Sequence, residues 1–395
     1  MSTTVRNMPM SAITPEEREA ILEAVREFAT TALAPHALEW DEKKYFPVDT
    51  LRSAGELGLG GIYVRDDHGG TGLGRSEAVA IFEELAQGDT TIAAYITIHN
   101  MVAWMIDTYG TDAQRAEWLP NMTAMIDLGS YCLTEPGAGS DAAAITTSAI
   151  RSGEDYVLTG VKQFISGAGS SAVYIVMART GEPGARGISA FIVPDGTPGL
   201  SFGANEKKMG WNAQPTRQVI LDEVRVPAAN LLGHEGQGFK IAMSALNGGR
   251  LNIAACSIGG AQWALDRAIR YVHERFTFGE ALAEKQSVVF ALADMATELR
   301  AARALVRDAA AALDAHTAGA SVPDVSLQCA MAKRFATDAG FTVANQALQL
   351  HGGYGYLHDY GIEKVVRDLR VHQILEGTNE IMRVIIGREL LGGSK

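Results

Sequence analysis

The sequence predicts an α+β protein in which an N-terminal α-helical domain (residues 1–128) and a C-terminal helical bundle (236–395) flank a β domain (129–235). Three observations predict this order. Apolar residues recur with helical spacing up to about residue 125 and again from residue 239. Between these parts, short β-branched runs alternate with turns rich in Gly, Pro and Asp. No helical pattern separates the strands, so we expect an antiparallel barrel or sandwich and not a parallel sheet with crossover helices.

The first helix has a clear start signal. Thr14, Pro15 and Glu17 form a predicted capping box with proline at the first helical position, and apolar residues from Ile21 to Ala32 then follow one face. Further helices are predicted at 49–57, 76–87, 91–109, 112–125, 252–275, 286–316, 325–351 and 379–391. Faces as apolar as those of the later helices usually also bury against another subunit, so we expect an oligomer.

Seven strands are predicted in the middle domain, at 130–133, 146–151, 156–165, 173–179, 188–193, 201–202 and 218–226. A glycine-rich stretch at 66–74 superficially resembles a nucleotide-binding loop. Its glycines lack the GxGxxG spacing and no βαβ pattern surrounds it, so we interpret it as a surface turn.

Charge and composition exclude several classes of protein. The net charge is −12 without long blocks of like charge, which argues against a nucleic acid or an anionic membrane as the main partner. Cys132, Cys256 and Cys329 form no CxxC pair, so neither a disulfide framework nor a zinc module is indicated, and we expect no metal. No apolar run approaches a membrane span, and residues 1–10 show neither a signal-peptide nor a transit-peptide pattern. We therefore expect a soluble cytoplasmic protein.

Glu376 is the strongest catalytic candidate. It ends an apolar run before Gly377, and Thr378 or Asn379 can cap the helix that follows. Apolar walls would raise the pKa of its carboxyl group towards neutrality, which suits a general base, and nearby backbone N–H groups could bind a developing oxyanion. The alternative is a solvated turn acid before a surface helix, and the local pattern alone does not decide between the two.

Two strand ends lead into turns that suit a flat polar ring and a phosphate. One spans residues 131–140, where Gly137 and Gly139 expose backbone N–H groups beside the Thr134 and Ser140 hydroxyls. The other places an aromatic ring before a hydroxyl, in Phe164-Ile165-Ser166. An ordinary β-turn and a packed core phenylalanine are the respective alternatives.

Two further candidates lie in the C-terminal part. Arg275 could bind a pyrophosphate, although a surface arginine at a helix end is commoner. His351 follows a helix that needs a glycine cap, where a capping or packing role is commoner than a catalytic one. A hydrolase has no support, because the sequence lacks a complete nucleophile elbow, an HExxH motif and a P-loop.

Five segments together resemble the acyl-CoA dehydrogenase family: YCLTEPGAGSDA, FISGAG, RFTFG, LQLHGGYGY and ILEGTNEIMR. They occur in the family's order, within its α, β, α layout and over essentially the whole chain. The segments KKMGWNAQPTR, EGQGF and LNGGR extend the resemblance to members that act on short branched acyl groups.

The resemblance implies that FAD lies between the β domain and the C-terminal bundle and that Glu376 is the catalytic base. Some relatives carry the base just before the arginine that matches Arg250, but Gly249 occupies that position here. Ser140, Arg250 and Arg388 are implied to lie near the substrate, although Arg388 could equally be a surface charge. Part of the FAD site would come from a neighbouring subunit of a homotetramer. The residues implied to contact FAD are Tyr131, Cys132, Leu133, Thr134, Glu135, Pro136, Gly137, Ala138, Gly139, Ser140, Phe164, Ile165, Ser166, Arg275, Lys285, Gln286, Gln349, Leu350, His351, Gly352, Gly353, Thr378, Asn379 and Glu380.

The reaction implied by the resemblance is α,β-dehydrogenation of a short branched acyl-CoA thioester, isobutyryl-CoA to methacrylyl-CoA, as in valine degradation. The base removes the α-proton, the β-hydride passes to flavin N5, and the electrons leave to an electron-transfer flavoprotein. A 2-methylbutyryl-CoA or straight short-chain dehydrogenase is the nearest alternative. An acyl-CoA oxidase would share the motifs but let oxygen reach the reduced flavin. A flavin-bearing nucleic-acid-binding relative would need a basic surface, which the net charge disfavours.

Overall fold

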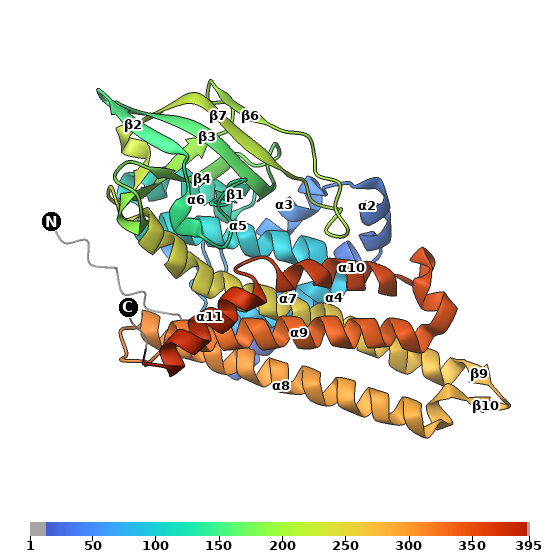
Figure 1. The fold of residues 1–395 in the computed structure, drawn as a ribbon. Coiled ribbons are helices and arrows are strands. Elements are labelled where there is room, and N and C mark those ends of the chain that lie inside the picture. The colour runs from blue at the N-terminus through green and yellow to red at the C-terminus, as the bar shows by residue number, and fades with distance from the viewer. Residues whose placement is uncertain (1–12, 393–395) are drawn as a thin grey trace.

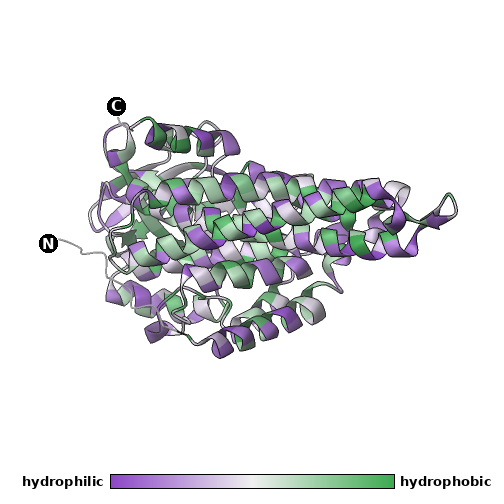
Figure 2. Cartoon of the chain, turned by 90° about the horizontal axis from the view of Figure 1, so that it is seen from below, coloured by the Kyte–Doolittle hydropathy of each residue, from purple (hydrophilic) through white to green (hydrophobic). Residues whose placement is uncertain are grey.

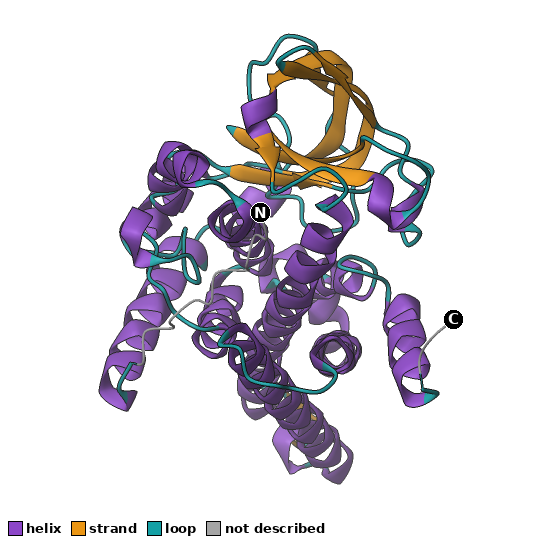
Figure 3. Ribbon diagram, turned by 90° about the vertical axis from the view of Figure 1, so that its left-hand side faces the viewer, coloured by secondary structure: helices purple, strands orange, loops and turns teal. Residues whose placement is uncertain are grey.

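A computed structural model of the chain describes residues 13–392. Helices from both ends of the sequence pack into one helical body, and the strands of the middle part form a β domain above it (Figure 1). The strands curl round on themselves when the molecule is viewed from its side (Figure 3). The predicted α+β class, with helical, β and helical parts in that order, is confirmed.

The helices before the β domain begin with the predicted capping box. The Thr14 side chain accepts a hydrogen bond from the Glu17 N–H at 3.1 Å, and the Glu17 carboxylate accepts one from the Thr14 N–H at 2.7 Å. These helices are α1 (Pro15–Phe28), α2 (Ala37–Lys43), α3 (Val48–Glu56), α4 (Arg75–Gly88), α5 (Thr90–Tyr109) and α6 (Asp112–Thr123). The sequence pattern did not predict α2, which is only two turns long.

The β domain contains one twisted sheet with the strand order β6-β7-β3-β2-β4-β5-β8. Most pairings are antiparallel, as predicted, but β1 and β2 pair with β4 in parallel. Period-two alternation reports which face of a strand is buried and carries no information on strand direction, so the pattern could not reveal these pairs. The strands are β1 (Gly129–Cys132), β2 (Ser148–Ser152), β3 (Asp155–Ser166), β4 (Val173–Arg179), β5 (Ile188–Pro194), β6 (Leu200–Phe202), β7 (Thr216–Pro227) and β8 (Leu231–Leu232).

The helices after the β domain form a bundle around α7, which packs against α4, α5, α8 and α9. Seen from below, the long helices mix apolar and polar residues along their length (Figure 2). The helices are α7 (Gly238–Glu274), α8 (Gln286–Thr317), α9 (Val325–His351), α10 (Ile362–Arg370) and α11 (Asn379–Leu390). A short hairpin of β9 (Phe276–Thr277) and β10 (Glu280–Ala281) projects at the far end of the bundle (Figure 1).

The predicted start of α7 at Asn252 is wrong, because the helix already begins at Gly238. Gly248 and Gly249 disfavour a helix by propensity, but the packing needs them. A Cβ atom on Gly248 would lie 2.4 Å from Nη1 of Arg75. Tertiary contact thus overrides local propensity over this part of the helix.

A carboxylate from the C-terminal bundle caps a helix of the N-terminal part. Asp314 on α8 accepts hydrogen bonds from the backbone N–H groups of Arg75 and Ser76, at 2.6 and 2.9 Å, and from the Ser76 hydroxyl at 2.7 Å. These are the unpaired N–H groups of the first turn of α4, where a negative charge is also favourable. In the described part of the chain, no helix combines the length and apolar character needed to cross a membrane.

Candidate active site

Glu376 lies in a tight turn between a short 3-10 turn (Val371–Gln373) and α11. Its backbone φ is +56°, and that of Gly377 is +88°. Thr378 then caps α11, since its hydroxyl accepts a hydrogen bond from the Ile381 N–H at 3.2 Å. A non-glycine residue in the left-handed region is uncommon, and such residues gather at functional sites.

The carboxyl group of Glu376 has the environment of a base. Its Oε2 atom is buried and, among residues 13–392, has no hydrogen-bond partner. Burial raises the pKa of Glu376 to about 7, although the positive charges of Arg250 and Lys333 oppose the rise. The side chain is therefore not a solvated turn acid, and its pKa suits proton transfer near neutral pH.

Gly249 on α7 faces this carboxyl group directly. A Cβ atom at Gly249 would lie 2.5 Å from Oε2 and 3.0 Å from Cδ of Glu376, and 3.3 Å from Sδ of Met101. A side chain at residue 249, where some relatives carry the base, would therefore start at the place that the Glu376 carboxyl group occupies here. A side chain at residue 249 and the Glu376 carboxyl group cannot occupy this point together.

Two of the three predicted substrate residues do not lie deep in the site. Arg250 is buried beside Glu376, donates to Oδ1 of Asn247 at 2.8 Å, and keeps a buried Nε without a partner in the described chain. Ser140 is exposed in its turn. Arg388 is exposed near the end of α11, about 14 Å of helix beyond Asn379, so the structure does not bring it to Glu376.

The turn after β1 is open on one side and anchored on the other. Cβ atoms on Gly137 or Gly139 would meet nothing within 4 Å, so the backbone there is accessible. Glu135 and Ala138 close the turn with two backbone hydrogen bonds of 3.0 and 3.1 Å. Pro136 is exposed and Thr134 half-buried, whereas Cys132 and Leu133 point into the interior.

Glu135 serves as the anchor of this turn. Its carboxylate accepts from the buried Lys162 ammonium at 2.8 Å and from the Thr146 and Thr147 N–H groups at 2.6 and 2.9 Å. Burial alone would raise the pKa of Glu135, but Lys162 and these donors bring it down to about 2. The Glu135 side chain is thus occupied in holding the turn, and its backbone N–H and carbonyl are paired with Ala138.

Phe164 is exposed on the surface of the chain and is not a packed core residue. Its backbone φ is +60°, and 64% of the residue is exposed. The next residue, Ile165, is buried, and Ser166 is half-buried. The Gln163 N–H donates to the Thr134 carbonyl at 2.8 Å, which fixes this strand end beside the β1 turn. An exposed aromatic ring in this position suits stacking on a flat group.

Three residues that sequence reasoning missed add polar atoms to this region. Nε1 of Trp211, both amide atoms of Gln214 and Nε2 of His372 are buried, and the described chain offers them no hydrogen-bond partner. The Trp211 and His372 rings lie edge to face with centroids 5.4 Å apart. The segment KKMGWNAQPTR contains the first two and was the available signal. With the buried Tyr131 hydroxyl, which also lacks a partner there, these atoms fit a flat ring with a polar edge.

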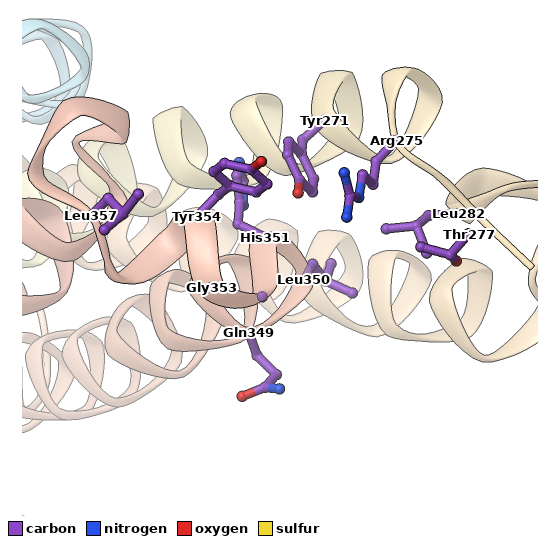
Figure 4. Close-up of a pocket in the computed structure, with 11 residues that line it drawn as sticks. Tyr271, Arg275, Thr277, Leu282, Gln349, Leu350, His351, Gly353, Tyr354 and Leu357 are labelled. Atoms are coloured by element: carbon purple, nitrogen blue, oxygen red, sulfur yellow. The ribbon is translucent and has the colours of Figure 1, made fainter.

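A second group of predicted residues lines a cavity of about 470 Å³ at the far end of the bundle (Figure 4). Arg275 lies beside Tyr271, and its guanidinium is 5.6 Å from the centre of the Tyr354 ring. His351 packs: its ring stacks on Tyr271 at 4.3 Å, and Nδ1 lies 2.7 Å from the Ala347 carbonyl oxygen. Gln349, Leu350, Gly352 and Gly353 complete the wall.

The two groups of residues are far apart within one chain. The stretch of α9 from Lys333, beside the Glu376 turn, to Gln349 measures about 24 Å. Lys285 pairs with Glu280 at 2.6 Å, and Gln286 begins α8 with an exposed side chain. Near Glu376, Asn379 is buried in hydrogen bonds and Glu380 is exposed.

Comparison with known proteins decides the family. The family models of the acyl-CoA dehydrogenase N-terminal, middle and C-terminal domains match residues 15–125, 130–224 and 236–391. The chain belongs to the acyl-CoA dehydrogenase family. The mitochondrial isobutyryl-CoA dehydrogenase of Bos taurus is 53% identical over 376 residues, which are 95% of this chain and 89% of that protein. Butyryl-CoA dehydrogenase of Megasphaera elsdenii is 37% identical with a TM-score of 0.91, covering 97% of this chain and 100% of that one.

The predicted family resemblance is therefore confirmed, and with it the assignment to the oxidoreductases. Acyl-CoA dehydrogenases are flavoproteins. A glutaryl-CoA dehydrogenase from Mycobacterium smegmatis, 29% identical with a TM-score of 0.90, was solved in complex with FADH2 and covers 97% of this chain and 96% of that one. The unpartnered polar atoms, the exposed Phe164 ring and the open glycine turn are compatible with such a group.

Proposed function

We propose that this acyl-CoA dehydrogenase uses FAD to convert isobutyryl-CoA into methacrylyl-CoA, with Glu376 as the base that removes the α-proton. The observation that carries the proposal is the Glu376 carboxyl group, with its unpartnered Oε2 and its pKa of about 7. The identity of 53% to a bovine isobutyryl-CoA dehydrogenase supports the substrate.

The residues around Glu376 support proton abstraction next to a thioester carbonyl. The Glu376 backbone N–H makes no hydrogen bond within residues 13–392, so it is free to donate to that carbonyl as negative charge develops there. Ala94, Ile253 and Leu375 pack with Trp211 in one apolar cluster, which gives the site an apolar wall. When bound, FAD would supply the acceptor for the β-hydride. We propose an electron-transfer flavoprotein as the protein to which the electrons pass on.

The absence of a side chain at Gly249 supports Glu376 as the base. Gly249 leaves this space to the Glu376 carboxyl group, and the next nearest atom to its missing Cβ is Sδ of Met101, at 3.3 Å. The branched acyl group, in which the α-carbon carries two methyl groups and one hydrogen, is proposed from the identity to the bovine isobutyryl-CoA dehydrogenase.

The separation of the two groups of residues supports a shared cofactor site in a homotetramer. Residues 131–140 and 164–166 would hold the flavin ring and its nearest phosphate in one subunit. Arg275 and residues 349–353 would reach the FAD of a neighbouring subunit, because about 24 Å of α9 separates them from the Glu376 turn in their own chain.

Anaerobic bleaching of the bound flavin by a panel of acyl-CoA thioesters tests the proposal. We expect fast bleaching by isobutyryl-CoA, and its loss in Glu376→Gln with the flavin still bound. Faster bleaching by 2-methylbutyryl-CoA or butyryl-CoA would keep the reaction and replace the substrate. Unchanged bleaching in Glu376→Gln would refute the role of the base, and rapid peroxide formation in air would indicate an acyl-CoA oxidase.

A further inference from the structure

Lys333 is a buried cation without a directly paired anion. It lies in the middle of α9 with 0% of its surface exposed. Its ammonium donates to the Gly377 carbonyl oxygen at 2.8 Å and to Oδ1 of Asn379 at 2.9 Å. Both acceptors are neutral, and no carboxylate forms an ion pair with Lys333 within residues 13–392. A buried ammonium is costly unless its hydrogen bonds and its surroundings compensate.

The two acceptors belong to the turn that carries Glu376. Gly377 follows Glu376 directly, and Asn379 is the first residue of α11. The bond to the Gly377 carbonyl orients the peptide between Gly377 and Thr378, which begins one residue after Glu376. The turn has a left-handed residue at Glu376 and another at Gly377, so it needs such support to stay in one conformation.

The same face of α9 holds the turn at further points. Asp338 accepts at Oδ1 from the Asn379 amide at 2.7 Å and from the Gln373 amide at 2.8 Å. Thr337 accepts from the Asn379 amide at 3.0 Å. Lys333, Thr337 and Asp338 lie four and five residues apart, on adjacent turns of the helix. α9 therefore forms hydrogen bonds with the chain both before Glu376, at Gln373, and after it, at Gly377 and Asn379.

Lys333 also acts on the Glu376 carboxyl group through its charge. The pKa of Lys333 itself is lowered to about 8 by burial, although the negative charge of Glu376 opposes the shift. The other titratable or charged groups that face this pair come from every neighbouring element: Tyr63 before α4, Tyr131 on β1, Arg250 on α7, Asp338 on α9, His372 in the 3-10 turn and Glu380 on α11.

We propose that Lys333 is a positioning residue for Glu376: its ammonium holds the Glu376-Gly377 turn in place, and its positive charge favours the ionised carboxylate. This inference rests on the proposed role of Glu376 as the base. Lys333 does not touch the substrate. It acts through the Gly377 carbonyl and through the electrostatic potential at Glu376.

Lys333→Met, Lys333→Gln and Lys333→Arg test the proposal in the FAD-loaded protein, with Lys240→Met as the control at an exposed lysine on α7. We expect Lys333→Met to bleach about tenfold more slowly with isobutyryl-CoA at pH 7. The pH at which its rate is half-maximal should rise by about one unit. Lys333→Arg should recover the native pH profile, and the affinity for the enoyl product should stay within about twofold. If Lys333 had a structural role alone, Lys333→Met would leave the pH dependence of the bleaching rate unchanged, and Lys333→Arg would have no shift to reverse.

Lys333→Gln keeps a donor for the Gly377 carbonyl without the charge, so it carries the test if Lys333→Met does not fold. An infrared titration gives a reading that needs no turnover. The band of the protonated Glu376 carboxyl, assigned by its loss in Glu376→Gln, should persist to higher pH in the neutral variants. Native titration and native bleaching profiles in Lys333→Gln would overturn the proposal. Failure of every thioester to bleach the native protein would refute the proposed function, while the infrared titration would still decide the role of Lys333.

Discussion

Gly249→Ala is the sharpest perturbation of the base that leaves its chemistry unchanged. The new methyl carbon would start 2.5 Å from Oε2 of Glu376, and ordinary contact begins at 3.4 Å, so the carboxyl group must move by about 1 Å. The Glu376 carboxyl is the end of a flexible side chain, so it can give way without unfolding the helix. A misplacement of about 1 Å can cost about a hundredfold in rate. Alanine is also favoured over glycine within a helix by roughly 0.5–1 kcal/mol, which offsets part of the strain.

The assay is rapid mixing with isobutyryl-CoA under anaerobic conditions, with thermal unfolding measured in parallel. We expect the bleaching rate of Gly249→Ala to fall by about one to two orders of magnitude while the melting temperature changes little. Gly387→Ala on α11 is the matched control, because a Cβ atom there would meet nothing within 4 Å. A native bleaching rate in Gly249→Ala would show that Glu376 does not transfer the proton from its position in this structure.

Three further predictions concern stability and cofactor binding. The folded pKa of Glu376, about 7, lies above its ordinary value of 4.5, so the unfolded chain loses this proton first and stability falls as the pH rises through that window. Glu376→Gln should therefore have a free energy of unfolding up to about 3 kcal/mol higher than the native protein at pH 8, seen as a higher melting temperature, and a much smaller gain at pH 5. Equal gains at the two pH values would contradict this. Arg275→Ala should raise the FAD dissociation constant about tenfold, measured by flavin lost on dialysis, with bleaching per bound flavin unchanged; full retention of flavin would argue against a phosphate contact. Glu135→Gln should cost about 3 kcal/mol at pH 7, because Lys162 remains buried without its partner. The folded pKa of Glu135, about 2, lies below 4.5, so its stabilisation is present above pH 4.5 and is lost towards pH 2, and thermal unfolding should show the gap between variant and native protein narrowing on acidification.

Local signals predicted the parts of the fold and the site that local chemistry determines. The capping box at Thr14 and the long helices were visible because cap residues and helical spacing are properties of neighbouring residues. The motif around Glu376 likewise predicted the turn, the helix cap at Thr378 and a neutral pKa, since the apolar run and the glycine stand beside it in sequence.

The rest of the site depends on contacts between distant segments. Trp211 and His372 come together because the loop before β7 packs on α10, where the backbone N–H of Trp211 donates to Oδ1 of Asp368 at 2.6 Å. In the sequence, Lys333 looks like an ordinary charged residue of a helix. Its contacts with the Glu376 turn become visible only when α9 and α11 are placed side by side. The start of α7 was wrong for the same reason: propensity at Gly248 and Gly249 argues against a helix, and only the packing against Arg75 and Glu376 explains why glycine is needed there.

The cap that Asp314 provides for α4 has a consequence for how the chain is made. Arg75 and Ser76 leave the ribosome long before Asp314, so the first-turn N–H groups of α4 have only water as an acceptor in place of this carboxylate until α8 has been synthesised. During translation the N-terminal helices therefore lack one contact that stabilises them in the finished protein. A nascent chain halted after the β domain should remain sensitive to proteases at α4, and completion of α8 should be the step that protects it.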